Sequence, residues 1–186
     1  MIRNFNEDSR VKIPALVHLT RLGYEYLSIK DDNIKNSIDP STNIFKHIFR
    51  ESINYINNTD FDDKKIDDLL IELSVKLKQD DLGRSFYELL INGYNGIRLI
   101  DFDDINKNKM SIVTELTYRN GDDEFRPDII VLINGMPLSF IEVKKPNNID
   151  GILAERNRIN TRFKNKKFRK FANITQLLVF SNNQPY

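Results

Sequence analysis

The sequence predicts an α/β protein with a helical first half and a β-sheet in the second half. Three observations predict this order. Apolar residues recur at helical spacing before residue 95, whereas after residue 96 they gather in short runs separated by turns. Between two of these runs stands an Asn-Gly dipeptide, a strong hairpin signal. We therefore expect one domain over residues 1–186, with a helical part over about 1–95 and a core over about 96–186.

The composition sets the limits of the interpretation. A chain of 186 residues with 40% hydrophobic residues is long enough for one sizeable core. Its 28 basic and 27 acidic residues give a net charge of +1, so only local patches can argue for nucleic acid binding. The absence of cysteine excludes disulfides, thiolate metal sites and a cysteine nucleophile. No membrane-spanning run or signal-peptide pattern is present, so we expect a cytoplasmic protein without a membrane partner.

The first half contains four segments with helical periodicity, at residues 9–22, 43–56, 62–78 and 83–91. In the first of them, Ser9 is a candidate N-cap and Gly23 a candidate stop, and the regular helix is expected to begin near Pro14. A short strand is expected at residues 24–29. The polar residues 30–42 are expected to form a loop.

The second half follows a different pattern, with expected strands at 97–102 and 110–118, a hairpin within 125–146, a helix at 151–165 and a strand at 176–180. We expect the N-terminal helices to cover the resulting sheet. The sequence stops soon after a strongly apolar strand. This position suggests a fragment of a longer polypeptide.

The hairpin segment reads F-R-P-D-I-I-V-L-I-N-G-M-P-L-S-F-I-E-V-K-K-P and carries charged residues at the ends of its apolar runs. Asp128 begins the first run, and Glu142 and Lys144 end the second. Residues two apart on a strand share a face, so Glu142 and Lys144 lie together. Charges at such positions are expected to be paired or functional, and our working hypothesis is a metal-dependent nuclease centre.

Whether Asp128 shares that face depends on the turn at Asn134-Gly135. An unbulged two-residue turn sets Asp128 opposite Ile141 and away from Glu142. A three-residue loop shifts the register by one, sets Asp128 opposite Phe140 and places it diagonal to Glu142. If the three charged residues form one site, the hairpin must therefore contain an odd loop or a bulge.

These residue types suit phosphodiester cleavage. Two adjacent carboxylates supply the hard oxygen ligands that Mg²⁺ prefers, and Val143 could add its backbone carbonyl. A bound metal lowers the pKa of its water, and a neighbouring lysine can orient that water and counter developing negative charge. The alternative is a Glu-Lys pair at a sheet edge that is merely solvated and paired to Arg126 or Lys145. On the residues alone, both interpretations stay open.

The motif Pro127-Asp128, followed by Glu142-x-Lys144, resembles the PD-(D/E)xK nuclease motif. The wider text from Arg126 to Lys144 resembles the N-terminal nuclease domain of the restriction (R) subunit of type I restriction–modification enzymes. Similarity extends to the start R-V-K-I-P-A-L-V-H-L-T-R-L-G-Y-E-Y-L, to Leu99-Ile100-Asp101-Phe102 and to Ser181-Asn182-Asn183, so it covers nearly the whole chain.

The resemblance implies a restriction-endonuclease-like mixed β-sheet flanked by helices. It implies that Asp128 and Glu142 bind Mg²⁺, that Lys144 assists the attacking water, and that double-stranded DNA is cut non-specifically when an ATP-driven motor stalls. No phosphate-binding loop occurs in this chain, so ATP would be used by motor domains outside it. The modification and specificity subunits would be partners and supply sequence recognition, in a prokaryotic cytoplasm.

One departure from the family pattern concerns the helix after the lysine strand. Many members carry a Gln-x-x-x-Tyr motif there, whereas this helix reads A-E-R-N-R-I-N-T-R-F, with Arg158 and Arg162 at i and i+4. The departure favours a second hypothesis, in which the domain cleaves poorly and mainly couples the motor to DNA or to the partner subunits. The intact Asp128, Glu142 and Lys144 favour cleavage.

Two further groups of residues are candidates for the site. Residues 156–170 contain eight basic residues and no acid, and this basic segment is expected to contact DNA phosphates, although it could be only a solvated face. Its expected contact residues are Arg156, Arg158, Arg162, Lys164, Lys166 and Lys167. Glu115, and with less support Glu88 or Glu7, could add a carboxylate near the metal, although each could also be a surface acid.

Overall fold

The computed structural model describes residues 11–144 and 151–181, and its centre is a five-stranded mixed sheet in the order β1-β2-β5-β6-β7. β2, β5 and β6 are joined by antiparallel pairing, whereas β1 and β7 pair in parallel at the two edges. The strands span β1 Glu25–Leu27, β2 Met110–Thr114, β5 Ile129–Ile133, β6 Met136–Val143 and β7 Leu177–Ser181. A separate antiparallel hairpin comprises β3 (Tyr118–Asn120) and β4 (Asp123–Phe125).

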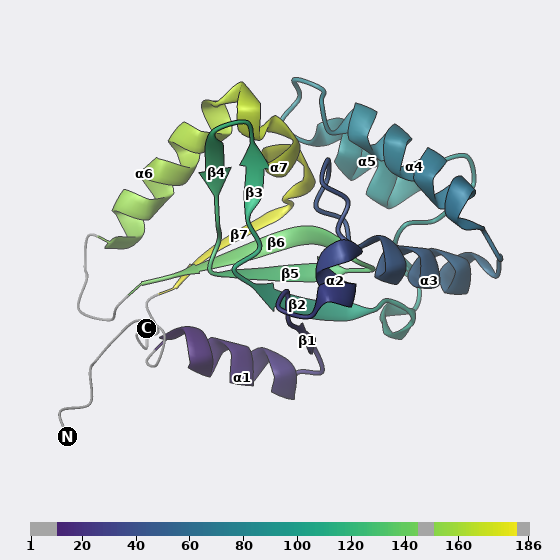
Figure 1. The fold of residues 1–186 in the computed structure, drawn as a ribbon, viewed down its shortest axis with the longest axis horizontal. Coiled ribbons are helices and arrows are strands. Elements are labelled where there is room, and N and C mark those ends of the chain that lie inside the picture. The colour runs from purple at the N-terminus through teal and green to yellow at the C-terminus, as the bar shows by residue number, and fades with distance from the viewer. Residues whose placement is uncertain (1–10, 145–150, 182–186) are drawn as a thin grey trace.

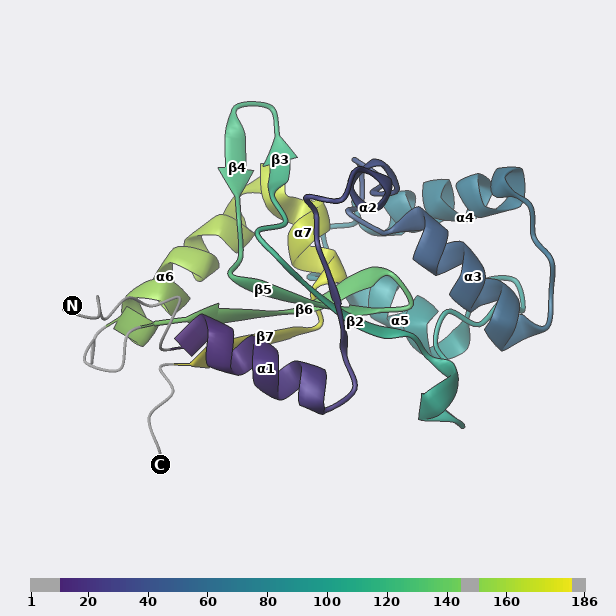
Figure 2. The same cartoon turned by 60° about the horizontal axis from the view of Figure 1, so that its bottom comes forward.

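Helices lie on both faces of the sheet and beyond one of its ends (Figure 1). α6, α7 and the β3–β4 hairpin lie on one side, and α1 lies on the opposite side, as Figure 2 also shows. α3, α4 and α5 gather at the end where the β5–β6 turn lies, far from the last residues of β6 and β7. The helices span α1 Ile13–Arg21, α2 Asp32–Asn36, α3 Lys46–Asn57, α4 Asp63–Lys76, α5 Arg84–Asn92, α6 Gly151–Lys164 and α7 Arg169–Ile174, with short 3₁₀ turns η2 Ile105–Lys107 and η3 Lys166–Phe168.

Two apolar clusters hold these layers together. One joins the faces of α3, α4 and α5 to Met136 and Leu138 of β6. The other lies between the sheet and α6–α7, where Phe171 packs edge-on against Phe125 with ring centroids 4.9 Å apart and stacks on Phe140 at 5.6 Å. Since burial of a large aromatic side chain contributes several kcal/mol, these contacts fix α7 and the β3–β4 hairpin on this face.

Most predicted elements are confirmed, but three segments differ. The expected strand at 97–102 is irregular, because Asp101 caps the backbone N–H groups of Asp103 and Asp104 in a local turn. The expected strand 110–118 breaks at Glu115, whose φ of 62° is left-handed, and β3 begins after the break. The expected loop 30–42 contains the short helix α2, capped by Asp31. The turns after α6 also form η3 and α7, which we did not predict.

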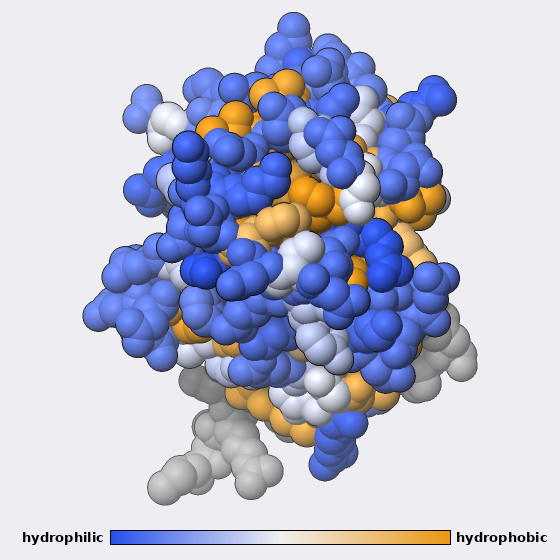
Figure 3. Space-filling model, turned by 90° about the vertical axis from the view of Figure 1, so that its right-hand side faces the viewer, coloured by the Kyte–Doolittle hydropathy of each residue, from blue (hydrophilic) through white to orange (hydrophobic). Residues whose placement is uncertain are grey.

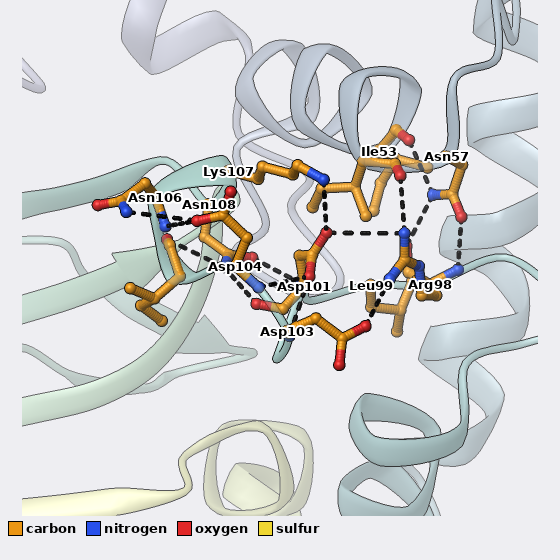
Figure 4. A network of polar contacts seen from close by, with 12 residues as sticks. Ile53, Asn57, Arg98, Leu99, Asp101, Asp103, Asp104, Asn106, Lys107 and Asn108 are labelled. Atoms are coloured by element: carbon orange, nitrogen blue, oxygen red, sulfur yellow. Dashed lines mark hydrogen bonds and ion pairs between the residues drawn. The ribbon is translucent and has the colours of Figure 1, made fainter.

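The β5–β6 turn is anchored by buried polar contacts. Asn134 and Gly135 have φ of 53° and 78°, as a two-residue type I′ turn requires. The buried Asn134 amide donates to the carbonyl of Leu99 and to Asn108 Oδ1, each at 2.9 Å. Asn108 in turn bonds the backbone of Asp101, in the network of Figure 4. The irregular 97–109 segment therefore holds the turn that begins β6.

The outer face of the helical end is mostly polar. Figure 3 views the molecule from the side of α3, α4 and α5 and shows a largely hydrophilic surface interrupted by small apolar areas. Exposed apolar residues on these helices include Ile71 and Val75 of α4 and Tyr87 and Ile91 of α5. Among the described residues, no helix combines the length and the apolar character that crossing a membrane requires.

Candidate active site

A β-bulge brings Asp128 and Glu142 together. The turn pairs Ile133 with Met136, but the register shifts between Val131 and Leu132, and Ile129 pairs with Ile141 beyond the shift. Extending this register by one residue sets Asp128 opposite Glu142, and opposite residues of an antiparallel pair share a face. The prediction of an odd loop or a bulge is thus confirmed. The specific three-residue loop is wrong, because the extra residue lies within β6 and not in the turn.

Asp128 stands at the start of β5 with one carboxylate oxygen engaged. Its Oδ2 accepts a hydrogen bond of 2.9 Å from the backbone N–H of Val143. In an extended strand the N–H and C=O of one residue point toward the same neighbour, so the carbonyl of Val143 faces the Asp128 side as well. Val143 itself is buried. This arrangement suits the predicted use of its carbonyl beside the two carboxylates.

Glu142 is a buried carboxylate in an interior strand. Its residue is 8% exposed, and its Oε2 has no hydrogen-bond partner among the described residues. Burial, and then the charge of Asp128, raises the pKa of Glu142, while Lys144 acts in the opposite direction. β6 lies between β5 and β7, so the alternative of a solvated pair at a sheet edge is wrong.

Lys144 follows β6 directly and shares the face of Glu142, as strand periodicity predicts. Its Nζ lies 3.1 Å from Glu142 Oε1 and donates to it, and its backbone N–H donates to the carbonyl of Ser181 at 2.8 Å. The side chain is only 14% exposed. The parallel pairing with β7 therefore fixes the backbone of the lysine, and the carboxylate fixes its amine.

Sequence reasoning missed the third acid of this cluster, Glu155 of α6. It is 2% exposed, and its Oε2 lies 3.4 Å from Lys144 Nζ. Helical periodicity holds the signal that could have found it, because Glu155 is in phase with the buried Gly151 and Ile159. The sequence-based prediction for this helix considered its arginines and the absent Gln-x-x-x-Tyr pair. It did not consider an acid on the buried face.

The acids proposed as extra metal ligands do not join the cluster. Glu115 follows β2 at the same end of the sheet, but its carboxylate pairs with Lys12 at 3.8 Å. Glu88 pairs with Arg84 on the exposed side of α5. Glu7 lies outside the described residues. Within residues 11–144 and 151–181, no group of three or more His, Cys, Asp or Glu side chains is placed to hold a metal ion.

The donor set nevertheless fits one hard divalent cation with few protein ligands. Asp128 and Glu142 lie close enough for the charge of one to raise the pKa of the other, and Glu142 Oε2 is a buried oxygen that no described residue hydrogen-bonds. A cation would remove both costs, since it neutralises the pair and coordinates the free oxygen. Mg²⁺ keeps several waters and commonly takes only one or two protein carboxylates, so two carboxylates and a carbonyl are sufficient.

The basic segment divides into residues that face the site and residues that do not. Arg158 and Arg162 pair with Glu155 at 2.7 and 3.9 Å, and the Arg162 guanidinium lies 4.3 Å from the centroid of the Phe125 ring. Lys167 pairs with Asp123 of β4 at 2.9 Å. The remaining expected contact residues are exposed on α6 and η3: Arg156, Lys164 and Lys166. The basic surface thus runs along α6 away from the site.

A hollow of about 1040 Å³ lies beside this region and is lined by residues that include Lys30, Lys35, Glu115 and Arg119. The three motif residues, Asp128, Glu142 and Lys144, are not among its lining residues.

Comparison with known proteins agrees with these features. The family model for the type I restriction enzyme R protein N terminus matches residues 4–185. The chain is 31% identical to the MjaIXP and 30% identical to the MjaVIIIP type I restriction endonuclease subunits named in Methanocaldococcus jannaschii. It is 30% identical to the type I restriction enzyme HindI endonuclease subunit of Haemophilus influenzae. These matches cover 77%, 56% and 71% of this chain, but it spans only 16%, 11% and 14% of the respective relatives.

Proposed function

The chain belongs to the family of type I restriction enzyme R protein N termini, and from this premise we propose that it is a Mg²⁺-dependent endonuclease domain. The observation that carries the proposal is the bulge in β6, which sets Asp128 opposite Glu142 and leaves Lys144 3.1 Å from the glutamate. A bulge that assembles buried like charges costs stability, and such devices are common beside active sites.

In this proposal Asp128, Glu142 and the carbonyl of Val143 hold the metal ion. The bound ion supplies a water of lowered pKa and Lewis-acid polarisation of the scissile phosphate. Lys144 orients the attacking water through its amine and offsets negative charge that develops on the phosphate. The sheet and α6 keep these groups out of bulk solvent, which strengthens each electrostatic interaction.

We further propose that double-stranded DNA is the substrate and that cutting does not depend on sequence. The basic residues of α6 and η3 begin at the site with Arg158 and Arg162 and continue along the helix away from it. They contact phosphates, which carry no sequence information. Sequence recognition would then come from modification and specificity subunits. The ATP-driven motor would lie in the remainder of a subunit such as the relatives possess, and its stalling would trigger cleavage.

The test is a cleavage assay of the assembled complex that carries Asp128→Asn or Lys144→Ala. The asparagine still offers an oxygen to the Val143 N–H, so the local backbone is preserved while the charge is lost. We expect cleavage to fall at least about 100-fold, while ATP-driven translocation persists. Cleavage at the normal rate by both variants would reject the proposal. It would favour a module that only couples the motor to DNA.

A further inference from the structure

α6 carries a buried acid, Glu155, that is not one of the two carboxylates proposed to bind the metal ion. Glu155 is 2% exposed, and a buried ionised carboxylate is tolerated only when it is paired. In the part of the chain that the structure describes, three cations approach it: Lys144 from the end of β6, and Arg158 and Arg162 from the next turns of α6 itself. Glu155 is therefore the point at which the β6 lysine and the α6 arginines meet.

Two plain explanations do not account for this arrangement. A helix-stabilising pair between Glu155 and Arg158 at i, i+3 works on a solvated surface and gains nothing from burial. Glu155 is also not a third metal ligand, because no three acidic side chains among the described residues are placed around one ion. Glu155 Oε2 moreover lacks a hydrogen bond of good angle, so its contacts with Lys144 and Arg158 are ion pairs.

The amine of Lys144 lies between two carboxylates, 3.1 Å from Glu142 Oε1 and 3.4 Å from Glu155 Oε2. The two acids have different roles in the proposed mechanism, because Glu142 coordinates the metal ion and Glu155 does not. When a metal ion occupies Glu142, the lysine keeps Glu155 as a carboxylate partner on the helix side. α6 then contributes to the position of the amine through Glu155.

We infer that Glu155 is a positioning residue, which holds the Lys144 amine beside the metal site while Glu142 serves as a metal ligand. The inference rests on the proposed nuclease function and deepens it. It also assigns Arg158 and Arg162 a role at the site, since they share the charge of Glu155 and limit how strongly it draws the lysine. Residues that orient catalytic groups in this way commonly change activity or metal affinity about 10- to 100-fold when they are replaced.

The first experiment measures single-turnover cleavage by the assembled complex with Glu155→Gln, alone and combined with Lys144→Ala. We expect the single variant to lose about 10- to 100-fold in rate at saturating DNA, with little change in DNA affinity. In the Lys144→Ala background the same replacement should have almost no further effect, because the two residues act as one unit. Equal losses in both backgrounds would show an independent structural role and overturn the inference.

The second experiment measures Mn²⁺ binding to the 186-residue chain by calorimetry and needs no catalysis. Without Glu155, more of the lysine charge falls on Glu142, where it competes with the cation. We expect Glu155→Gln to weaken Mn²⁺ binding about 10-fold and Lys144→Ala to abolish that effect. Unchanged Mn²⁺ affinity together with an unchanged cleavage rate would overturn the inference.

Two further variants separate the possible failures. Glu155→Asp keeps the charge and guards against misfolding of the glutamine variant, and it should retain more activity than Glu155→Gln. The control Glu88→Gln removes an exposed glutamate that pairs with Arg84 on α5 at 3.0 Å, and it should behave as wild type. If Asp128→Asn leaves cleavage and Mn²⁺ binding intact, the nuclease function fails. If Asp128→Asn impairs cleavage and Mn²⁺ binding but Glu155→Gln changes neither, the nuclease function is supported and the positioning role is rejected.

Discussion

The backbone N–H of Val143 donates a 2.9 Å hydrogen bond to Asp128 Oδ2 and ties the end of β6 to the start of β5. This bond joins the two segments that carry Asp128 and Glu142, and its donor and acceptor residues are 15 apart in the chain. It means that the aspartate is oriented by the sheet before any cation binds. A preorganised ligand loses less entropy on binding than a mobile one.

A first prediction concerns the effect of Mg²⁺ on stability. A ligand that binds only the folded state adds about 2.7 kcal/mol at one hundred times its dissociation constant. We expect thermal unfolding of this chain to shift upward as Mg²⁺ is added, and the shift to vanish in Asp128→Asn. Glu124→Gln, which removes an exposed carboxylate of β4, serves as the control and should keep the shift. An equal shift in Asp128→Asn would place the cation elsewhere.

A second prediction concerns the turn that sets the register of β6. A Cβ at Gly135 would lie 2.7 Å from the carbonyl oxygen of Phe45 and 2.9 Å from the backbone nitrogen of Phe49. Gly135→Ala should therefore lower the free energy of unfolding through both its positive φ and this clash. Gly96 has a similar φ of 81°, but a Cβ added there would meet no atom within 4 Å, so Gly96→Ala isolates the effect of the backbone conformation.

We expect Gly96→Ala to cost about 1–2 kcal/mol, the usual penalty of a left-handed residue. Gly135→Ala should cost roughly 1–3 kcal/mol more, because α3 must move away from the turn. Urea denaturation of the two variants measures the difference. Equal losses would mean that the turn does not depend on its contact with α3.

A third prediction follows from the raised pKa of Glu142. A raised pKa means that the folded protein holds the proton more tightly than the unfolded chain does. Stability is therefore lost as the pH rises from the usual value of 4.5 through the higher folded-state pKa. Above the folded-state pKa, the ionised Glu142 lowers the free energy of unfolding, so Glu142→Gln should raise it there by roughly 0.5–2 kcal/mol while abolishing cleavage.

The measurement is urea denaturation of Glu142→Gln and wild type at a series of pH values from about 4 upward, without metal ions. The stabilisation should shrink at the lower pH, where the wild-type carboxyl is protonated in the folded state and largely so in the unfolded chain. A variant that is less stable than wild type at neutral pH would show that the ion pair with Lys144 outweighs burial.

Part of this site could be predicted from the sequence, and part could not. The alternation of apolar residues identified β5 and β6, and strand periodicity placed Glu142 and Lys144 on one face. The bulge in β6 was required by the hypothesis but could not be located, because it depends on contacts of the turn with α3 and with the 97–109 segment. Glu155 was missed for a similar reason, since its partner Lys144 comes from another element.

The segment 97–102 shows the opposite error. Its apolar residues Leu99 and Ile100 are buried as expected for a strand, yet the backbone is irregular. The carbonyl of Leu99 accepts the amide of Asn134, and Asp101 caps its own turn, so the backbone groups are satisfied without a ladder. Hydrophobicity predicted burial here and not the hydrogen bonding that decides secondary structure.

The last prediction concerns DNA binding by the basic segment. Each phosphate that a cation neutralises contributes about 0.9 to the slope of log K against log salt for duplex DNA. Replacing Arg158, Arg162 and Lys166 together with alanine should weaken binding and reduce that slope by up to about 2.7. Arg158 and Arg162 should contribute less than about 0.9 each to this slope, because both are paired with Glu155. Lys166 is exposed on η3 and should contribute more.

The single variant Lys166→Ala should therefore change the slope by nearly its full share, and Arg162→Ala by less. Lys64→Ala and Lys65→Ala, both exposed on α4 at the far end of the sheet, give a control of the same charge change per residue that should not alter the slope. Titrations at several salt concentrations make the comparison, with Mg²⁺ omitted so that DNA is not cut. If the α4 control lowers the slope as much as the triple variant does, the duplex does not follow α6. The basic segment would then be only a solvated face.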